Sequence, residues 1–383
     1  MSVTAAAGFR AAGVAAGLKS TGAPDVALVV NDGPISSAAA VFTSNRCKAN
    51  PVLWSEQAIS TGSARAVVLN SSGANCYTGA AGFQIVHETA ELAGELLGVG
   101  PIDVQVCSTG LIGLLNDKDD LLGGVREAAS ALSADGGAAA STAIMTTDTV
   151  SKQAVRSGDG YTIGGMAKGA GMLAPALATM LVVITTDADL SAADLDSALR
   201  AATAQSFDRL DSDGCQSTND TVLLMASGAA EVAPDLAEFT ALLTDLCRDL
   251  ALQLLADAEG ADHEIAIETV NAASEQDALD VSRSVARSNL FKCAIFDKDP
   301  NWGRILASVG TTQAAFDPAD LDVALNGVWV CRNSGPAEDP SGIDLEQRAV
   351  TVTIDLKAGK EAATIWTNDL TQAYVHENSA YSS

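Results

Sequence analysis

Short β-rich runs come in groups along this chain, and stretches with the apolar spacing of a helix lie between the groups. Runs at 25–30, 38–43 and 64–70 are bounded by Gly, Asn or Pro, as strands that end in turns are. The spacing over 83–97 predicts a helix instead. Grouped strands favour an α+β fold over a regular βαβ series. We therefore expect layered β-sheets flanked by helices.

The second half of the chain has the same character. We expect helices near 192–205, 236–257 and 275–288. We expect strands over 161–167, 221–228, 264–270, 322–330, 348–356 and 362–367. A further strand is expected to begin at Thr179, after a glycine-rich turn.

Charge and apolar content exclude several classes of protein. Apolar residues make up 48% of the 383 residues, which excludes general disorder. The net charge of -26 repels phosphate backbones and anionic lipid, so we expect no nucleic-acid and no membrane partner. The longest apolar run, 172–184, is interrupted and too short to span a bilayer. No signal peptide is recognisable, so a cytoplasmic location is expected.

The residues that usually hold metals and nucleotides lack the required spacing. The seven cysteines include no CxxC pair and predict buried, reduced thiols. The three histidines do not form HExxH, and neither GxSxG nor a phosphate loop is present. The run 169–174 matches GxGxx[GA], but Pro175 leaves no room for the helix that a dinucleotide site needs. We expect no metal and no cofactor.

The segment 166–188 carries the most distinctive chemistry. A glycine-rich turn leads to Ala178, and Thr179 then opens a strongly apolar run. The hydroxyl of such a threonine can attack its own preceding carbonyl, and hydrolysis of the resulting ester leaves Thr179 as a new N-terminus. Its α-amine then serves as the base for its own hydroxyl. A threonine that opens a strand also has an ordinary explanation in β-propensity, and both interpretations stay open at this point.

Long motifs connect the chain to a known family. The segment KGAGMLAPALATMLVVITTDA resembles the cleavage segment of the ornithine acetyltransferase / N-acetylglutamate synthase family of arginine biosynthesis. Other matching segments follow the family order: GFRAAGVAAGLK, LNSSGANCYTG, CSTGLIG, AIMTTDT, STNDTV, FKCAIFDKDPNWGRILASVG and YVHENSAYSS. The resemblance covers essentially the whole chain. It implies a layered architecture similar to that of N-terminal-nucleophile enzymes.

The resemblance also implies self-cleavage. The bond between Ala178 and Thr179 would break, giving chains of residues 1–178 and 179–383 that form one interleaved catalytic unit. Thr179 would be the nucleophile. The hydroxyl of Thr109 and the backbone N–H of Gly110 would form the oxyanion hole, because a tetrahedral intermediate needs fixed donors. The ordinary alternative for these two is a strand that ends in a turn.

Three residues of the first half are substrate candidates by the same resemblance. Lys168 is implied to bind the substrate carboxylate, although a lone lysine before a glycine turn is usually a solvated surface charge. Thr146 aligns with a substrate-contacting threonine. Thr147 remains an alternative, because a small deletion before Lys168 would shift the alignment.

The second half supplies three more candidates. Glu259 matches a substrate-binding glutamate, and a carboxylate suits the side-chain ammonium of ornithine. The family usually has Thr-Lys where this chain has Asp262 and His263, which puts the local charge pattern in doubt. Asn378 and Ser383 match C-terminal positions that touch substrate, although a chain end is ordinarily frayed.

The function implied is transfer of an acetyl group from N2-acetylornithine to glutamate through an acetyl ester of Thr179, without a cofactor. A bifunctional member would also use acetyl-CoA as a co-substrate. An aminopeptidase or amidohydrolase with water as acceptor is one alternative, and a non-catalytic acidic binding protein is another. The family implies assembly of two cleaved pairs.

Asn75, Asn219 and Asp220 are interpreted as structural residues that hydrogen-bond turns near the site.

Overall fold

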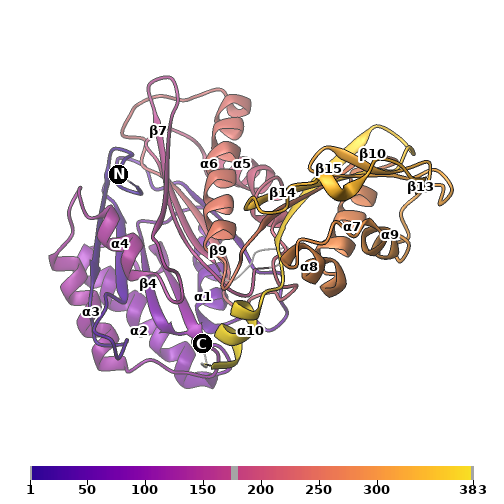
Figure 1. Cartoon of the computed structure of the whole chain (residues 1–383). Coiled ribbons are helices and arrows are strands. Elements are labelled where there is room, and N and C mark those ends of the chain that lie inside the picture. Colours follow the sequence, from indigo (N-terminus) through magenta and orange to yellow (C-terminus); the bar gives the residue numbers. More distant parts are fainter. Residues whose placement is uncertain (1, 174–179, 381–383) are drawn as a thin grey trace.

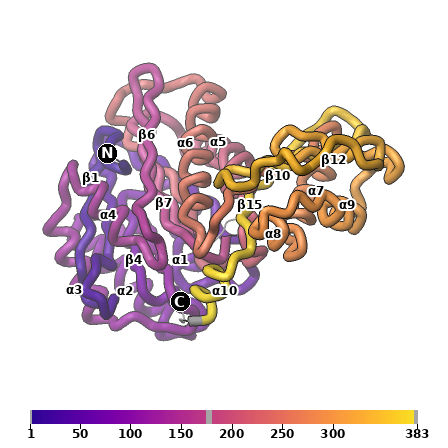
Figure 2. Tube along the Cα trace, in the orientation of Figure 1, coloured from indigo at the N-terminus to yellow at the C-terminus, as the bar shows by residue number. Residues whose placement is uncertain are grey.

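The computed structural model describes residues 2–173 and 180–380. Two β-sheets and their covering helices form a layered body, and a third sheet with its own helices extends from the body as a lobe (Figure 1). After the lobe the chain returns to the body, where the last helix lies (Figure 2).

The first sheet of the body has the strand order β1-β2-β4-β5. Its bounds are β1 (Phe9–Val14), β2 (Val26–Asn31), β4 (Ala66–Gly73) and β5 (Val104–Leu111). Alternate residues of β2 point to opposite faces, because side chains along a strand have a period of two. Leu28 packs in one apolar cluster with Trp54, Val86 and Val125 of three covering helices. These are α1 (Asn50–Ala58), α2 (Gly79–Leu97) and α3 (Lys118–Ser130).

The second sheet packs on the other face of the first. Its strand order is β3-β9-β8-β7-β6. The bounds are β3 (Ala38–Phe42), β6 (Lys152–Ser157), β7 (Thr162–Lys168), β8 (Leu181–Thr186) and β9 (Thr221–Ala226). Val29 and Leu69 of the first sheet share a buried cluster with Val183 and Leu223 of the second. The short helix α4 (Gly137–Ala143) adds Ala140 to that cluster.

Two helices cover the outer face of the second sheet: α5 (Ala192–Ala204) and α6 (Leu236–Ala256). Ile184 of the sheet packs with Leu199 and Leu250 of these helices. Each helix begins at an N-cap whose side chain accepts backbone N–H groups, Ser191 for α5 and Asp235 for α6. The body is therefore a stack of helices, sheet, sheet and helices.

The lobe contains a six-stranded sheet in the order β13-β12-β11-β14-β10-β15. Its strands are β10 (Glu264–Ala272), β11 (Asp322–Leu325), β12 (Val328–Arg332), β13 (Gly335–Pro336), β14 (Ala349–Asp355) and β15 (Glu361–Asn368). Its helices are α7 (Glu275–Ala286), α8 (Asn289–Phe296) and α9 (Trp302–Val309). The chain then ends the described part in α10 (Gln372–Ala380). Short 3-10 turns lie at Ile59–Thr61, Pro101–Asp103, Phe207–Arg209 and Pro340–Gly342.

The expected α+β class with layered sheets and flanking helices is confirmed. The single strand expected over 322–330 is wrong, because a turn at Asn326 and Gly327 divides it into β11 and β12. Both residues have positive φ, 46° and 83°, which is the geometry of a tight hairpin turn. The expected strand start at Thr179 lies outside the described residues, and β8 is described from Leu181.

The cysteine prediction is partly wrong. All seven cysteines are free thiols, as expected, but Cys47, Cys215 and Cys293 are exposed. The apolar neighbours of Cys107 and Cys331 predict their burial correctly, whereas the exposed cysteines lie in loops or on the outer face of a helix. Among the described residues, none of the helices combines the length and apolar character that crossing a bilayer requires.

Candidate active site

A cavity of about 800 Å³ lies where loops from both sheets of the body meet the ends of the lobe. It is lined by every described residue that the family resemblance singled out as a site residue: Thr109, Gly110, Thr146, Lys168, Glu259 and Asn378. Ala178, Thr179 and Ser383 lie outside the described residues. The cavity therefore gathers residues that are far apart in the sequence.

Thr109 and Gly110 occupy the end of β5, beside the parallel strand β4. Thr109 is buried, and its hydroxyl oxygen accepts a hydrogen bond of 3.0 Å from Lys168 Nζ. Gly110 has a φ of 126°, and a Cβ there would lie 1.9 Å from the carbonyl oxygen of Ser72. Only glycine fits this close approach.

Lys168 ends β7 and is almost fully buried, so the ordinary alternative of a solvated surface lysine does not hold. Its ammonium donates to the hydroxyls of Thr109 and Thr146, over 3.0 and 2.8 Å. Thr147 also lines the cavity, but the hydroxyl that Lys168 holds belongs to Thr146. Burial lowers the pKa of Lys168, and the nearby carboxylate of Asp148 opposes that effect.

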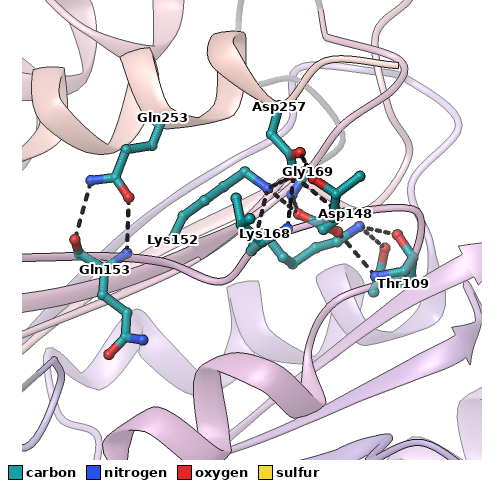
Figure 3. Close-up of polar contacts among 11 residues, drawn as sticks. Thr109, Asp148, Lys152, Gln153, Lys168, Gly169, Gln253 and Asp257 are labelled. Carbon is teal, nitrogen blue, oxygen red and sulfur yellow. Dashed lines mark hydrogen bonds and ion pairs between the residues drawn. The ribbon is translucent and has the colours of Figure 1, made fainter. Parts of the chain in front are cut away.

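Asp148 lies close to Lys168 and Lys152 (Figure 3) and also lines the cavity. One of its oxygens accepts from the backbone N–H of Gly169 and from Lys152 Nζ, each over 2.7 Å. The other accepts from the backbone N–H of Thr146 over 3.0 Å. Burial alone would raise the pKa of Asp148, but the ammonium groups of Lys168 and Lys152 lower it to about 2. The carboxyl is therefore ionised at neutral pH.

Glu259 follows α6, and its carboxylate lies against Gly171 at the cavity wall. Its backbone N–H donates to the carbonyl of Ala170 over 2.9 Å. A Cβ on Gly171 would lie 2.6 Å from the nearest carboxylate oxygen of Glu259, so a larger residue would displace that carboxylate. Asp262 and His263, which differ from the family pattern, do not line the cavity; the His263 ring pairs with Asp369 instead.

Asn378 comes from α10, the helix that returns to the body (Figure 2). Thr371 anchors the start of this helix, because its hydroxyl donates to the carbonyl of Gly260 and accepts from the N–H of Tyr374. The expectation that the C-terminal segment approaches the site agrees with the position of Asn378 on the cavity wall.

The three residues interpreted as structural hydrogen-bond backbone groups of helices, strands and loops near the cavity. Asn219 donates to the carbonyls of Ala74 and Ser108, over 2.6 and 2.8 Å, and Asn75 donates to the start of α2. Asp220 accepts from the backbone N–H of Met180 over 3.0 Å. Burial raises the pKa of Asp220 well above its ordinary value.

Sequence reasoning missed three charged residues at the site. Lys19 lines the cavity and donates to the carbonyls of Pro24 and Met145, over 2.8 and 2.7 Å. Asp148 and Lys152 were not singled out either. The four-residue spacing between that acid and that base is the one local signal for their pairing.

Comparison with known proteins identifies the family of the chain that forms this site. The sequence pattern of the ArgJ family matches residues 10–383. The chain belongs to the ArgJ family. A protein of Streptomyces coelicolor, an arginine biosynthesis bifunctional protein ArgJ, is 61% identical over 383 residues and is covered completely, as is this chain. A protein of Thermobifida fusca with the same name is 62% identical over 382 residues, again with complete coverage of both.

Solved structures give partial matches. An ornithine acetyltransferase of Mycobacterium tuberculosis, complexed with ornithine, is 55% identical; the match covers 45% of this chain and 94% of that chain, with a TM-score of 0.45. An ArgJ protein of Bacillus halodurans is 34% identical, with 52% and 98% covered and a TM-score of 0.48.

Membership of the ArgJ family confirms the resemblance drawn from the motifs. It makes the chain an acetyltransferase of arginine biosynthesis, not a non-catalytic binding protein. It also favours the acetyltransferase over the aminopeptidase alternative.

Proposed function

We propose that the chain moves an acetyl group from N2-acetylornithine to glutamate and that Thr179 carries the acetyl group between them. The chain belongs to the ArgJ family, and one structural observation gives this proposal its strongest support. Lys168 and Glu259 line the same cavity as Thr109 and Gly110. An ammonium and a carboxylate in one cavity complement the opposite charges of a small amino acid. A peptide substrate offers such charges only at its ends.

The proposed transfer has two halves. The hydroxyl oxygen of Thr179 attacks the acetyl carbonyl carbon, and the α-amine of the same residue takes the hydroxyl proton. The amide C–N bond breaks, that proton passes to the leaving nitrogen, and ornithine departs. The amine of glutamate then attacks the acetyl ester, and the hydroxyl of Thr179 is restored. Two smaller barriers replace one large barrier.

Thr109 and Gly110 are the proposed oxyanion hole. The hydroxyl oxygen of Thr109 already accepts from Lys168, so its own proton is available for the developing oxyanion. The backbone N–H of Gly110 is the second donor. Fixed donors of this kind each contribute about 3 kcal/mol to transition-state stabilisation.

Cleavage between Ala178 and Thr179 creates the proposed nucleophile. Strands β7 and β8 pair side by side, and Lys168 is opposite Leu181. The chain between these two residues therefore starts at Lys168 on the cavity wall and ends at the strand neighbour of Lys168. Strands from before and after the proposed break share the second sheet, which supports chains 1–178 and 179–383 remaining one unit.

We also propose a second acetyl donor and an assembly of several cleaved chains. The relatives are named bifunctional, which supports acetyl-CoA as a second acetyl donor for glutamate. The ornithine-complexed relative supports small amino acids as partners. We place the enzyme in the cytoplasm, assembled from two cleaved pairs.

Product analysis tests the reaction. Purified protein is incubated with N2-acetylornithine, with and without glutamate, and ornithine, N-acetylglutamate and acetate are measured. The proposal predicts equal amounts of ornithine and N-acetylglutamate, with little acetate. Rapid acetate release that glutamate does not divert would instead support the hydrolase alternative. A separate incubation of acetyl-CoA with glutamate tests the second donor.

A further inference from the structure

A buried ion cluster lies beside the cavity, which Asp148 lines, and its members are outside the residues that the family resemblance assigned to substrate. The ammonium of Lys152 lies between the carboxylates of Asp148 and Asp257, at 2.7 and 2.5 Å (Figure 3). The side chains of Lys152 and Asp148 have no exposed surface, and that of Asp257 has 7%. Burying three charges is costly, and apolar residues of similar volume often replace such clusters without loss of stability. Stability alone therefore gives a weak reason for this cluster.

The cluster joins three segments of the body. Asp148 belongs to the loop before β6, and Lys152 begins β6. Asp148 also accepts the backbone N–H of Gly169, at the end of β7, over 2.7 Å. Asp257 is the C-cap of α6 and accepts the backbone N–H of Thr149 over 2.9 Å. One ammonium thus holds a loop, a strand end and a helix end together.

Each of these segments carries one proposed substrate contact. Thr146 lies two residues before Asp148, and its backbone N–H donates to that carboxylate. Lys168 directly precedes Gly169, and the backbone N–H of Gly169 donates to Asp148. Glu259 lies two residues after Asp257. The distances among the three contacts therefore depend on where the cluster holds their segments.

We propose that Asp148, Lys152 and Asp257 form a positioning cluster that sets the spacing between the carboxylate-binding Lys168 and the ammonium-binding Glu259. The inference rests on the proposed function. The three residues are positioning residues, since none of them belongs to the oxyanion hole or to the nucleophile. The cluster governs the affinity for a zwitterionic amino acid more than the acetyl-transfer step.

The cluster also controls the charge of Lys168. Burial lowers the pKa of Lys168, and Asp148 is the foremost carboxylate that opposes this. The other charged groups near that ammonium are Lys152, Asp220, Glu259 and Lys19. Without the negative charge of Asp148, the pKa of Lys168 falls further, so its ammonium is lost at a lower pH. The KM for the amino-acid substrate then begins to rise at a lower pH than in the wild type.

The test compares kcat and KM of the wild type with those of Lys152→Met, Asp257→Asn and Asp148→Asn. We expect a rise in KM for N2-acetylornithine, which carries both the carboxylate and the side-chain ammonium, on the order of 10-fold, because small displacements of binding groups are costly. We expect kcat to change by less than about 3-fold. Lys152→Arg, which keeps the charge, should recover part of the lost affinity. Asp148→Asn should also shift the alkaline rise in KM to lower pH.

A matched control lies one residue further along the same strand and on the same helix. Gln253 of α6 exchanges two hydrogen bonds with the backbone of Gln153 on β6, at 3.1 Å each (Figure 3). Gln253→Ala removes a tie between the same two elements but touches no proposed substrate contact. Its KM should stay within about 2-fold of the wild type.

Two results would overturn the positioning role. One is a KM in Lys152→Met and Asp257→Asn that does not exceed that of Gln253→Ala. The other is a fall in kcat with unchanged KM. If Lys152→Met yields no folded protein, Asp257→Asn decides, because the amide retains an acceptor for Thr149. Failure of the proposed function is distinguishable, since the wild type would then transfer no acetyl group to glutamate.

Discussion

The layered body and the lobe of residues 264–368 differ in where their buried charges lie, because the buried Lys292 and Asp322 of the lobe do not line the cavity. The body buries charged groups beside its cavity, including Lys152, Lys168 and Asp220. The core of the lobe is an apolar cluster in which residues such as Ile267 and Val352 have no exposed surface. Among the described residues, the large cavity is lined by none from the lobe.

The lobe nevertheless begins and ends at the site. Glu259 lies just before its first strand, and Asn378 lies just after its last, on α10. A rigid lobe fixes the separation of its own two ends. The groups proposed for the chemistry therefore belong to the body, and the lobe fixes the separation of the two proposed substrate contacts that flank it.

Among variants that keep the proposed nucleophile, the largest effect on turnover is expected from Thr109→Val. The substitution removes an oxyanion donor and a partner of Lys168. We expect kcat to fall on the order of 100- to 1,000-fold, because one such donor contributes that much in comparable sites. Steady-state kinetics with N2-acetylornithine and glutamate measure it. Unchanged turnover would remove the oxyanion role from Thr109.

A smaller effect is expected from Lys168→Met, which removes the proposed partner of the substrate carboxylate. We expect KM to rise on the order of 10-fold, since a charge-assisted hydrogen bond contributes roughly 1.5–3 kcal/mol. The loss should be similar for N2-acetylornithine and glutamate, which share the α-carboxylate. A KM equal to that of the wild type would contradict the carboxylate-binding role.

The smallest effect on turnover is expected from a truncation in the lobe. Ile267→Ala in β10 and Ile184→Ala in β8 remove the same atoms from fully buried positions. Each should lower the free energy of unfolding by about 2–5 kcal/mol, because a cavity replaces packed atoms. Chemical denaturation measures this loss.

Only the truncation in the body should also lower kcat, measured well below the unfolding transition. β8 begins next to the proposed cleavage segment, whereas β10 belongs to the lobe and none of its residues lines the cavity. Equal losses of kcat in Ile267→Ala and Ile184→Ala would remove the distinction between the chemical body and the supporting lobe.

Much of the fold was predictable from apolar periodicity alone. The expected helix near 236–257 corresponds closely to α6 (Leu236–Ala256) because its apolar face is regular. The strand expected over 322–330 failed because apolar content outweighed the Asn326–Gly327 turn signal. Local pattern therefore predicts elements well but can join two strands across a short turn.

The site was less predictable from local pattern. Glu259 is one of 48 acidic residues, and only the family motif distinguishes it. The cluster of Lys152 with Asp257 joins residues 105 positions apart, which no local spacing can show. Buried charges of this kind depend on the tertiary contacts that compensate them, so they become visible only in the folded chain.

The proposed function depends on Thr179 becoming a catalytic N-terminus. The most direct measurement is the mass of the denatured, freshly purified protein, compared with that of Thr179→Ala. We predict two chains in the wild type, with the masses of residues 1–178 and 179–383, and one intact chain in the variant. A single intact chain in the active wild type, or cleavage that survives Thr179→Ala, would contradict the claim.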